Sequence, residues 1–170
     1  MKRILVGTGG SRWSEAAVAY AARLAKEQGA ELLIVHVLSP PALPAHEKRH
    51  REAEAILERA RKVAAEHLET VDARCLKGTV ADVLIDTADR EDCDLIVIGS
   101  RGRSRVRDRL LGSVLLRVIA DTHRPVTVVK ESAELEEALK VGKERMAFPE
   151  TPEPYAHLEA AAPEGAKREE

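Results

Sequence analysis

Short apolar runs alternate with stretches of helical spacing along the first 130 residues of the chain. A run that is apolar at nearly every position is typical of a strand covered on both faces. Four such runs predict strands at Arg3–Thr8, Glu31–Leu38, Asp94–Gly99 and Val126–Lys130, and a weaker pattern predicts another at Thr70–Leu76. They predict a sheet buried between two layers.

The segments between these runs repeat apolar residues every three or four positions, which predicts amphipathic helices. The expected helices are Trp13–Gln28, Ala45–Leu68, one that begins after Thr79, and Ser113–Thr122. Gly29 predicts a C-cap, and Thr79 with Asp82 fits a capping box. In the last helix, the residues expected to face the core are Val114, Leu115, Val118 and Ile119.

Alternation of strands and helices predicts an α/β fold, a doubly wound parallel sheet with helices on both faces. Ligands of such sheets bind beyond the carboxyl ends of the strands, where the strand order reverses. The chain after Thr8, Leu38 and Gly99 is therefore expected to border a binding site.

Residues 131–170 depart from this pattern. Ser132–Arg145 predicts one short helix, and the remainder has four prolines and many acidic residues. Such a composition predicts a largely disordered extension, because it offers little apolar surface to a core. The segment carries 11 acidic and 5 basic side chains, a net charge of −6, against +4 for residues 1–130. We therefore expect a domain at 1–130 and an acidic C-terminal extension at 131–170.

The remaining composition excludes several classes of protein. Cys75 and Cys93 fit no zinc or redox spacing and are expected to be small buried hydrophobes. No apolar stretch approaches the roughly 20 residues of a membrane helix. The N-terminal MKRILVGT lacks the longer apolar region of a cleavable signal. These features predict a cytoplasmic protein that does not enter membranes.

The most informative stretch for chemistry runs from Gly99 to Val114. Glycines stand at 99, 102 and 112, Ser113 follows the last, and arginines occupy positions 101, 103, 105, 107 and 109. A glycine-rich turn that opens a helix favours an anion, because free N–H groups and the helix dipole point at it. The alternative is a set of turn glycines in a solvated loop. Nucleic acid is not expected, since the core is only mildly basic and few aromatics are present to stack bases.

The spacing Gly-x2-Gly-x9-Gly-Ser resembles the nucleotide-binding signature of the universal stress protein family. The flanking sequences DLIVIGSRG and GSVLLRVIADTHRPVTVV are similar to that family, as are KRILVGTGGSRWSEAAVAYAARLA and ELLIVHV. The resemblance covers about residues 2–130. It implies a five-stranded sheet of order 3-2-1-4-5 and a homodimer formed through the last strand, Val126–Lys130.

The resemblance also implies a ligand, ATP, ADP or AMP, with or without Mg²⁺. The residues that match phosphate- and ribose-binding positions are Gly99, Arg101, Gly102, Gly112, Ser113 and Val114. The backbone of Val37 matches the position that meets adenine. Thr8, Gly9 and Gly10, at the tip of the first strand, are also expected to contact the nucleotide.

One position departs from the family pattern. Gly9-Gly10-Ser11 stands where members usually have Asp-Gly-Ser, so the acidic residue is missing. Loss of this Asp has three alternative consequences: weaker affinity for the nucleotide, a different ligand, or no dependence on Mg²⁺. The sequence does not choose among them. Two hypotheses follow: a nucleotide-binding regulatory module, at most a slow ATPase, or a dimeric interaction protein that has lost nucleotide binding. An ATP pyrophosphatase is disfavoured, because Thr8 and Trp13 replace the Ser and Asp of its loop.

Three further features have structural and functional interpretations. Trp13 either packs at a helix start or stacks on a base, and packing is favoured. His36 is expected to be a packed, hydrogen-bonded histidine. His46, Glu47 and His50 have helical spacing, but a solvated helix end is favoured over a metal site. The sequence shows neither a pair of nucleophile and base nor paired carboxylates, so nothing in it indicates fast catalysis.

Overall fold

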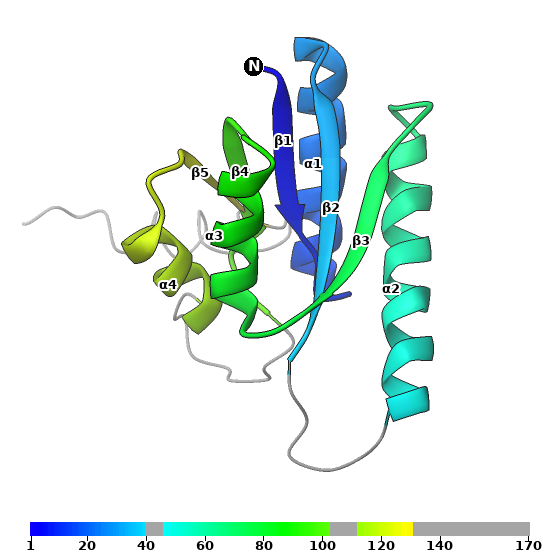
Figure 1. The fold of residues 1–170 in the computed structure, drawn as a ribbon. Helices are drawn as coiled ribbons and strands as arrows, with labels where there is room; N and C mark the ends of the chain where they lie inside the picture. The colour runs from blue at the N-terminus through cyan, green and yellow to red at the C-terminus, as the bar shows by residue number, and fades with distance from the viewer. Residues whose placement is uncertain (40–45, 103–111, 131–170) are drawn as a thin grey trace, which may run out of the picture. The chain divides into compact units, whose positions relative to one another are not determined.

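A computed structural model describes residues 1–39, 46–102 and 112–130 of the chain (Figure 1). These residues belong to one compact unit that ends at Ser132. The predicted helix Ser132–Arg145 and the acidic extension lie outside the described residues. So do the arginines at 103, 105, 107 and 109.

Five strands and four helices alternate along the described chain. Their bounds are β1 Arg3–Gly7, α1 Arg12–Gln28, β2 Glu31–Leu38, α2 His46–Ala65, β3 Asp72–Lys77, α3 Val80–Arg90, β4 Leu95–Gly99, α4 Ser113–Asp121 and β5 Val126–Val129. All strand pairs are parallel, and the order is β3-β2-β1-β4-β5. This confirms both the fold predicted from the alternating pattern and the order implied by the family resemblance.

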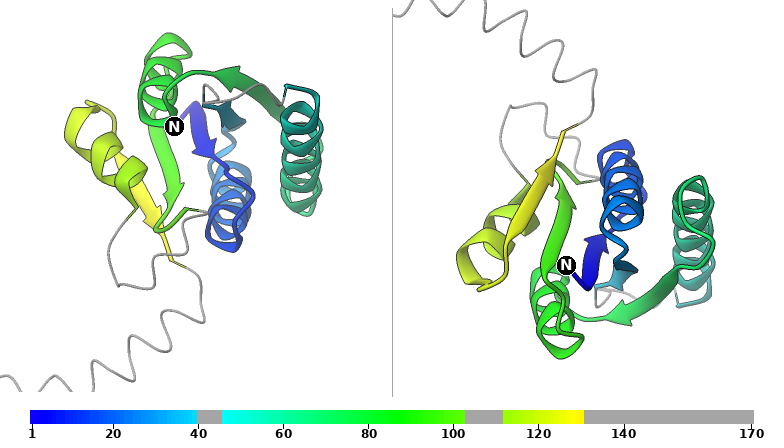
Figure 2. Two further views of the ribbon diagram at one scale, coloured as in Figure 1. Left: turned by 90° about the horizontal axis from the view of Figure 1, so that it is seen from below. Right: turned by 90° about the horizontal axis from the view of Figure 1, so that it is seen from above.

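Helices cover both faces of the sheet. Figure 2 shows α1 and α2 on one side and α3 and α4 on the other. Successive strand residues point to opposite faces, so β1 sends Ile4 and Val6 into the core under α1 and α2, and Leu5 into the core under α3. The central strands are fully buried for this reason, as their uninterrupted apolar runs predicted.

The helix ends agree with the sequence in part. Gly29 is a left-handed C-cap with φ of 60°, as predicted. Thr79 is the N-cap of α3, but the predicted capping box is absent, since the Thr79 side chain makes no capping hydrogen bond. Asp82 instead pairs with Arg117 of α4 at 2.6 Å. A tertiary ion pair has replaced the predicted local capping hydrogen bonds.

Two burial predictions were wrong. Ile119 was expected to face the core, but its exposed fraction is 47%. Leu116, one turn earlier on α4, is also exposed, at 52%. Cys75 is exposed because β3 is an edge strand, whereas Cys93 is buried as expected. Burial raises the pKa of the Cys93 thiol to about 11.

Ion pairs concentrate at the amino edge of the sheet, where the strands begin. Arg3 pairs with Glu31 and, at 2.7 Å, with Glu91, and Arg74 reaches Glu91 at 2.6 Å. The Arg74 guanidinium holds the pKa of the Glu91 carboxyl below its usual value. This network lies at the opposite edge from the carboxyl ends of the strands, so we assign it to structure.

Candidate functional site

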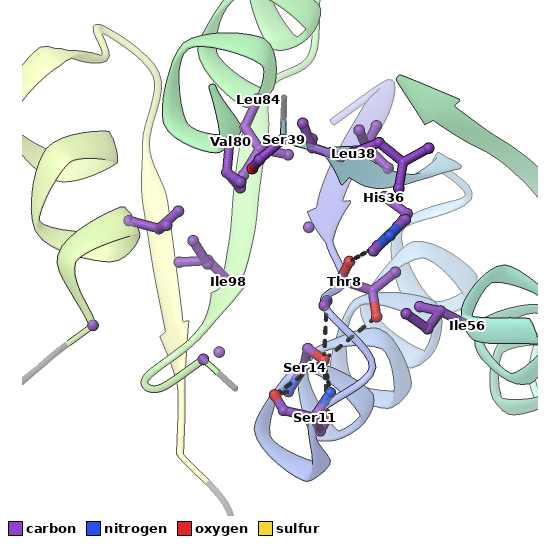
Figure 3. A pocket seen from close by; sticks show the side chains of 18 of the residues that line it. Thr8, Ser11, Ser14, His36, Leu38, Ser39, Ile56, Val80, Leu84 and Ile98 are labelled. Atoms are coloured by element: carbon purple, nitrogen blue, oxygen red, sulfur yellow. Dashed lines mark hydrogen bonds between the residues drawn. The ribbon is translucent and has the colours of Figure 1, made fainter. Parts of the chain in front are cut away.

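A pocket of about 400 Å³ opens at the carboxyl edge of the sheet, where β1 neighbours both β2 and β4 (Figure 3). The order of the strands reverses there, and crevices at this point bind ligands in doubly wound folds. Its volume lies within the range of small-molecule sites. The pocket includes residues that follow β1, β2 and β4, as predicted for the chain after Thr8, Leu38 and Gly99.

The structure brings all but one of the predicted site residues to this pocket. Those that line it are Thr8, Gly9, Val37, Gly99, Arg101, Gly102, Gly112, Ser113 and Val114. Gly10 is the exception. Residues about 100 positions apart, such as Gly9 and Gly112, therefore border the same space.

Gly10 and Gly99 are required for packing. Gly10 has φ of +74°, and a Cβ there would lie 2.7 Å from Ile56 Cγ1 of α2. A Cβ at Gly99 would lie 2.7 Å from the backbone oxygen of Trp13. Both positions therefore exclude a side chain. At Gly99 the reason is that β4 ends directly against the first turn of α1.

The first turn of α1 is closed by its own serines. Ser11 Oγ accepts from the Ser14 backbone N–H at 3.2 Å, and Ser14 Oγ accepts from the Ser11 N–H at 3.0 Å. The Gly9 N–H also donates to Ser14 Oγ, at 3.3 Å (Figure 3). This capping box satisfies donors that an anion would otherwise meet, so the start of α1 is a poor anion site.

The first turn of α4 is different. Its N-cap is Gly112, and within the described chain no side chain caps it. The Gly112 N–H donates to Ser100 O at 3.2 Å. The following N–H groups have no partner within the helix, and Ser113 and Val114 border the pocket. This is the end of the pocket that favours an anion.

Another part of the pocket is mainly apolar. Val80 and Leu84 of α3 and Ile98 of β4 form one side, and Ile56 of α2 lies across from them (Figure 3). Such a surface suits the faces of a planar ring system. The pocket therefore has one end suited to an anion and another suited to an aromatic group.

His36 is buried, and its Nδ1 lies 2.8 Å from Thr8 O. This confirms the expectation of a packed, hydrogen-bonded histidine, and the residue lines the pocket as well. A ring nitrogen that bonds a carbonyl is the donor, so Nδ1 carries a proton. His36 thereby ties the end of β1 to β2.

The contribution of α2 was missed by sequence reasoning. Arg49, Glu52 and Ala53 line the pocket, and Arg49 Nη2 donates to Ser39 O at 2.6 Å. Ala53 and Ile56 of α2 are also buried core residues. No local motif marks them, because only the crossover from β2 to β3 brings α2 over this edge of the sheet.

No cluster of three or more His, Cys, Asp or Glu side chains that suits a metal ion occurs within the described ranges. The side chains of His46 and Glu47 are not among those that the structure describes. In the same part of the chain, none of the helices is both long and apolar enough to cross a membrane.

A search of family models matches residues 1–130 to the Universal stress protein family. A universal stress protein of Methanocaldococcus jannaschii is 35% identical over 140 residues, covering 76% of this chain and 82% of the relative. A universal stress protein of Thermus aquaticus is 37% identical over 135 residues, covering 76% of this chain and 98% of the relative.

Solved structures give the same relationship. A universal stress protein crystallised in complex with cAMP has a TM-score of 0.63 and 32% identity, and the match covers 76% of this chain and 96% of that one. A universal stress protein of Archaeoglobus fulgidus in complex with dAMP has a TM-score of 0.60 and 25% identity. The match covers 76% of this chain and 98% of that one. Both ligands contain an adenine base and a phosphate.

Proposed function

Because this chain belongs to the universal stress protein family, we propose that it binds an adenine nucleotide, ATP, ADP or AMP, at the carboxyl edge of its sheet. The observation that carries the proposal is the convergence of Gly102, Gly112 and Ser113 with the tips of β1 and β2 on one pocket. The complexes of two relatives with cAMP and dAMP support it. We assign the chain a regulatory role in a stress response, with at most slow ATP hydrolysis.

The phosphates belong at the start of α4 in this proposal. The uncapped first turn offers backbone N–H groups and the positive end of the helix dipole. Ser113 and Arg101 also line the pocket, and the backbone of Arg101 lies beside Gly112, the N-cap of α4. Hydrogen bonds from charged donors to phosphate are among the stronger ones in proteins, so Arg101 adds affinity there.

The base belongs near the end of β2. Val37 lines the pocket, and the side chains of Val80 and Ile98 supply apolar surface. A backbone N–H and C=O at the end of a strand can pair with the edge of adenine, while apolar side chains cover its faces. This arrangement binds the base without a dedicated charged side chain.

The proposal is tested by extracting nucleotide from the purified protein and by titrating the stripped protein. We expect adenine nucleotide in the extract and a raised melting temperature with millimolar ATP, ADP or AMP. A ligand at a hundredfold excess over Kd stabilises the folded state by about 2.7 kcal/mol. GTP serves as the control for the base. An unchanged melting temperature with all three adenine nucleotides, with and without Mg²⁺, rejects the proposal.

A second function, a dimeric interaction module without nucleotide, is favoured by a different set of observations. Gly9 leaves the tip of β1 without the family's acidic residue. At the far edge of the sheet, all residues of β5 are only half-buried, and Leu116 and Ile119 of α4 are exposed. This module self-associates but shows no melting shift with nucleotide, which separates the two functions.

A further inference from the structure

Trp13, the only tryptophan of the protein, contacts two cations at the start of α1. The centre of its ring lies 4.6 Å from Arg12 Cζ and 5.8 Å from Arg101 Cζ. Both distances are within the roughly 6 Å over which a cation interacts with an aromatic face. Arg101 lines the pocket, whereas Trp13 does not. The ring thus lies behind a pocket residue and does not meet the ligand space itself.

The backbone from which the ring projects is held in place by its neighbours. The absence of a side chain at Gly99 lets β4 end against the backbone of Trp13. The capping box of Ser11 and Ser14 fixes the same turn of α1. The indole Nε1 is buried and has no hydrogen-bond partner among the described residues. Burial of this polar atom costs free energy, so the site holds the indole despite an unfavourable contribution.

We propose that Trp13 is a positioning residue that holds the Arg101 guanidinium at the pocket, where it meets the phosphate of the bound nucleotide. This inference rests on the proposed function. An arginine side chain loses rotamer freedom when it is ordered by a ligand. A contact that orders it beforehand removes part of that cost. The cation–π contact uses the charge of the group and none of its N–H donors.

The proposal predicts selectivity for the phosphate part of the ligand. Trp13→Leu retains every charge of the protein, so long-range attraction of an anion is unchanged. The substitution removes the ring from both arginines that contact it, and of these two only Arg101 lines the pocket. Adenosine has no phosphate for Arg101 to meet, and its affinity therefore should not depend on Trp13.

The test is calorimetric titration of ATP, AMP and adenosine into wild type, Trp13→Leu, Trp13→Phe, Arg101→Gln and the Trp13→Leu/Arg101→Gln double variant. We expect Trp13→Leu to weaken ATP and AMP about three- to tenfold and to leave adenosine unchanged. Trp13→Phe keeps an aromatic face and should recover part of the loss. The double variant should lose no more than Arg101→Gln alone, because the two residues act through one contact.

A matched control lies farther along α1. Arg23 Cζ is 5.7 Å from the ring of Tyr20, a contact of the same kind between residues that do not line the pocket. Arg23→Gln should leave the ratio of ATP to adenosine affinity unchanged. Circular dichroism of each variant checks that it is folded. In ligand-free protein, Arg101→Gln should change the emission spectrum of the single tryptophan.

Equal losses for ATP and adenosine in Trp13→Leu, or additive losses in the double variant, overturn the positioning role. An emission spectrum that does not respond to Arg101→Gln overturns it without any ligand. If folded Trp13→Phe binds ATP as weakly as Trp13→Leu, the ring face is not the cause, and the proposal fails. A wild-type protein that binds neither nucleotide nor adenosine rejects the proposed function itself, and the positioning role with it.

Discussion

The glycines at and beside the pocket differ in the space that a side chain would have. A Cβ at Gly10 or Gly99 would collide with another segment of the protein, whereas a Cβ at Gly9 or Gly112 would not. A Cβ at Gly112 would lie 3.7 Å from Gly102 N, and a Cβ at Gly9 would meet nothing within 4 Å. Neither has a positive φ. A Cβ at either position is therefore compatible with the fold, so we expect variants at these positions to fold and their effects on binding to be measurable.

Gly112→Val should abolish nucleotide binding while the protein stays folded. The valine side chain would enter the space in front of the first turn of α4, where the phosphates are proposed to bind. Titration with ATP and a thermal melt measure the two effects separately. Gly99→Ala is the contrasting variant: its Cβ meets the Trp13 backbone, and we expect a loss of about 1–3 kcal/mol in stability. Wild-type affinity in folded Gly112→Val would show that the glycine is only a turn residue.

Gly9→Asp should make ATP binding more dependent on Mg²⁺. The side chain has room at the end of β1 and borders the pocket. Magnesium is commonly held by one or two carboxylates together with phosphate oxygens. The measurement is ATP affinity with Mg²⁺ and with EDTA, and Gly9→Asn is the control of similar size. Equal dependence on Mg²⁺ in the Asp and Asn variants would mean that the carboxylate does not reach the metal.

At the scale of elements, the start of β1 is held by the carboxyl group that precedes β4. Asp94 accepts hydrogen bonds from the backbone N–H groups of Lys2 and, at 3.0 Å, Arg3. These bonds favour the charged form and hold the pKa of Asp94 below its usual value. A carboxyl whose pKa is lowered by folding stabilises the protein above its unfolded pKa and loses that contribution as pH falls.

Asp94→Asn should therefore lower the melting temperature at pH 7. The difference from wild type should shrink as the pH falls below about 4, the ordinary pKa of an aspartate, and through the lower value of the folded state. Thermal melts between pH 2 and 7 measure it. Asp86→Asn, at an exposed position on α3, is the control and should melt like wild type. A difference that stays constant with pH would argue against a role for the charge.

At the scale of the whole molecule, β5 is the last strand of the described sheet. Pro125 O and Val129 O accept from Ile96 N and Ser100 N of β4. Backbone groups of a strand alternate in direction, so the amides of Val126 and Val128 face away from β4. An apolar edge of this kind favours pairing with another strand, which supports the homodimer expected from the family resemblance.

Val128→Pro should convert the dimer to a monomer while the domain stays folded. Proline removes the one backbone donor at position 128 and is tolerated at a sheet edge. Sedimentation at micromolar concentration measures the change, with Val128→Ala as the control that retains the donor. A wild-type protein that sediments as a monomer contradicts the predicted dimer, and an unaltered dimer in Val128→Pro places the interface elsewhere.

The sequence by itself determined the strands, the helices and the edge of the sheet at which the pocket lies. Consecutive apolar residues and helical spacing are local patterns, and burial of both sheet faces follows from them. The glycine positions of the site were also readable, because their spacing resembles that of a family. The order of the strands came from that resemblance rather than from the pattern.

The tertiary structure decided what lies beside each residue. It placed Ala53 and Ile56 of α2 on the pocket, tied His36 to Thr8, and brought Arg101 to Trp13. It also paired Asp82 with Arg117 in place of a local cap. Each of these contacts joins elements that are separated by a crossover. A local pattern records which face of an element is buried, but the partner on that face depends on how the crossovers pack against the sheet.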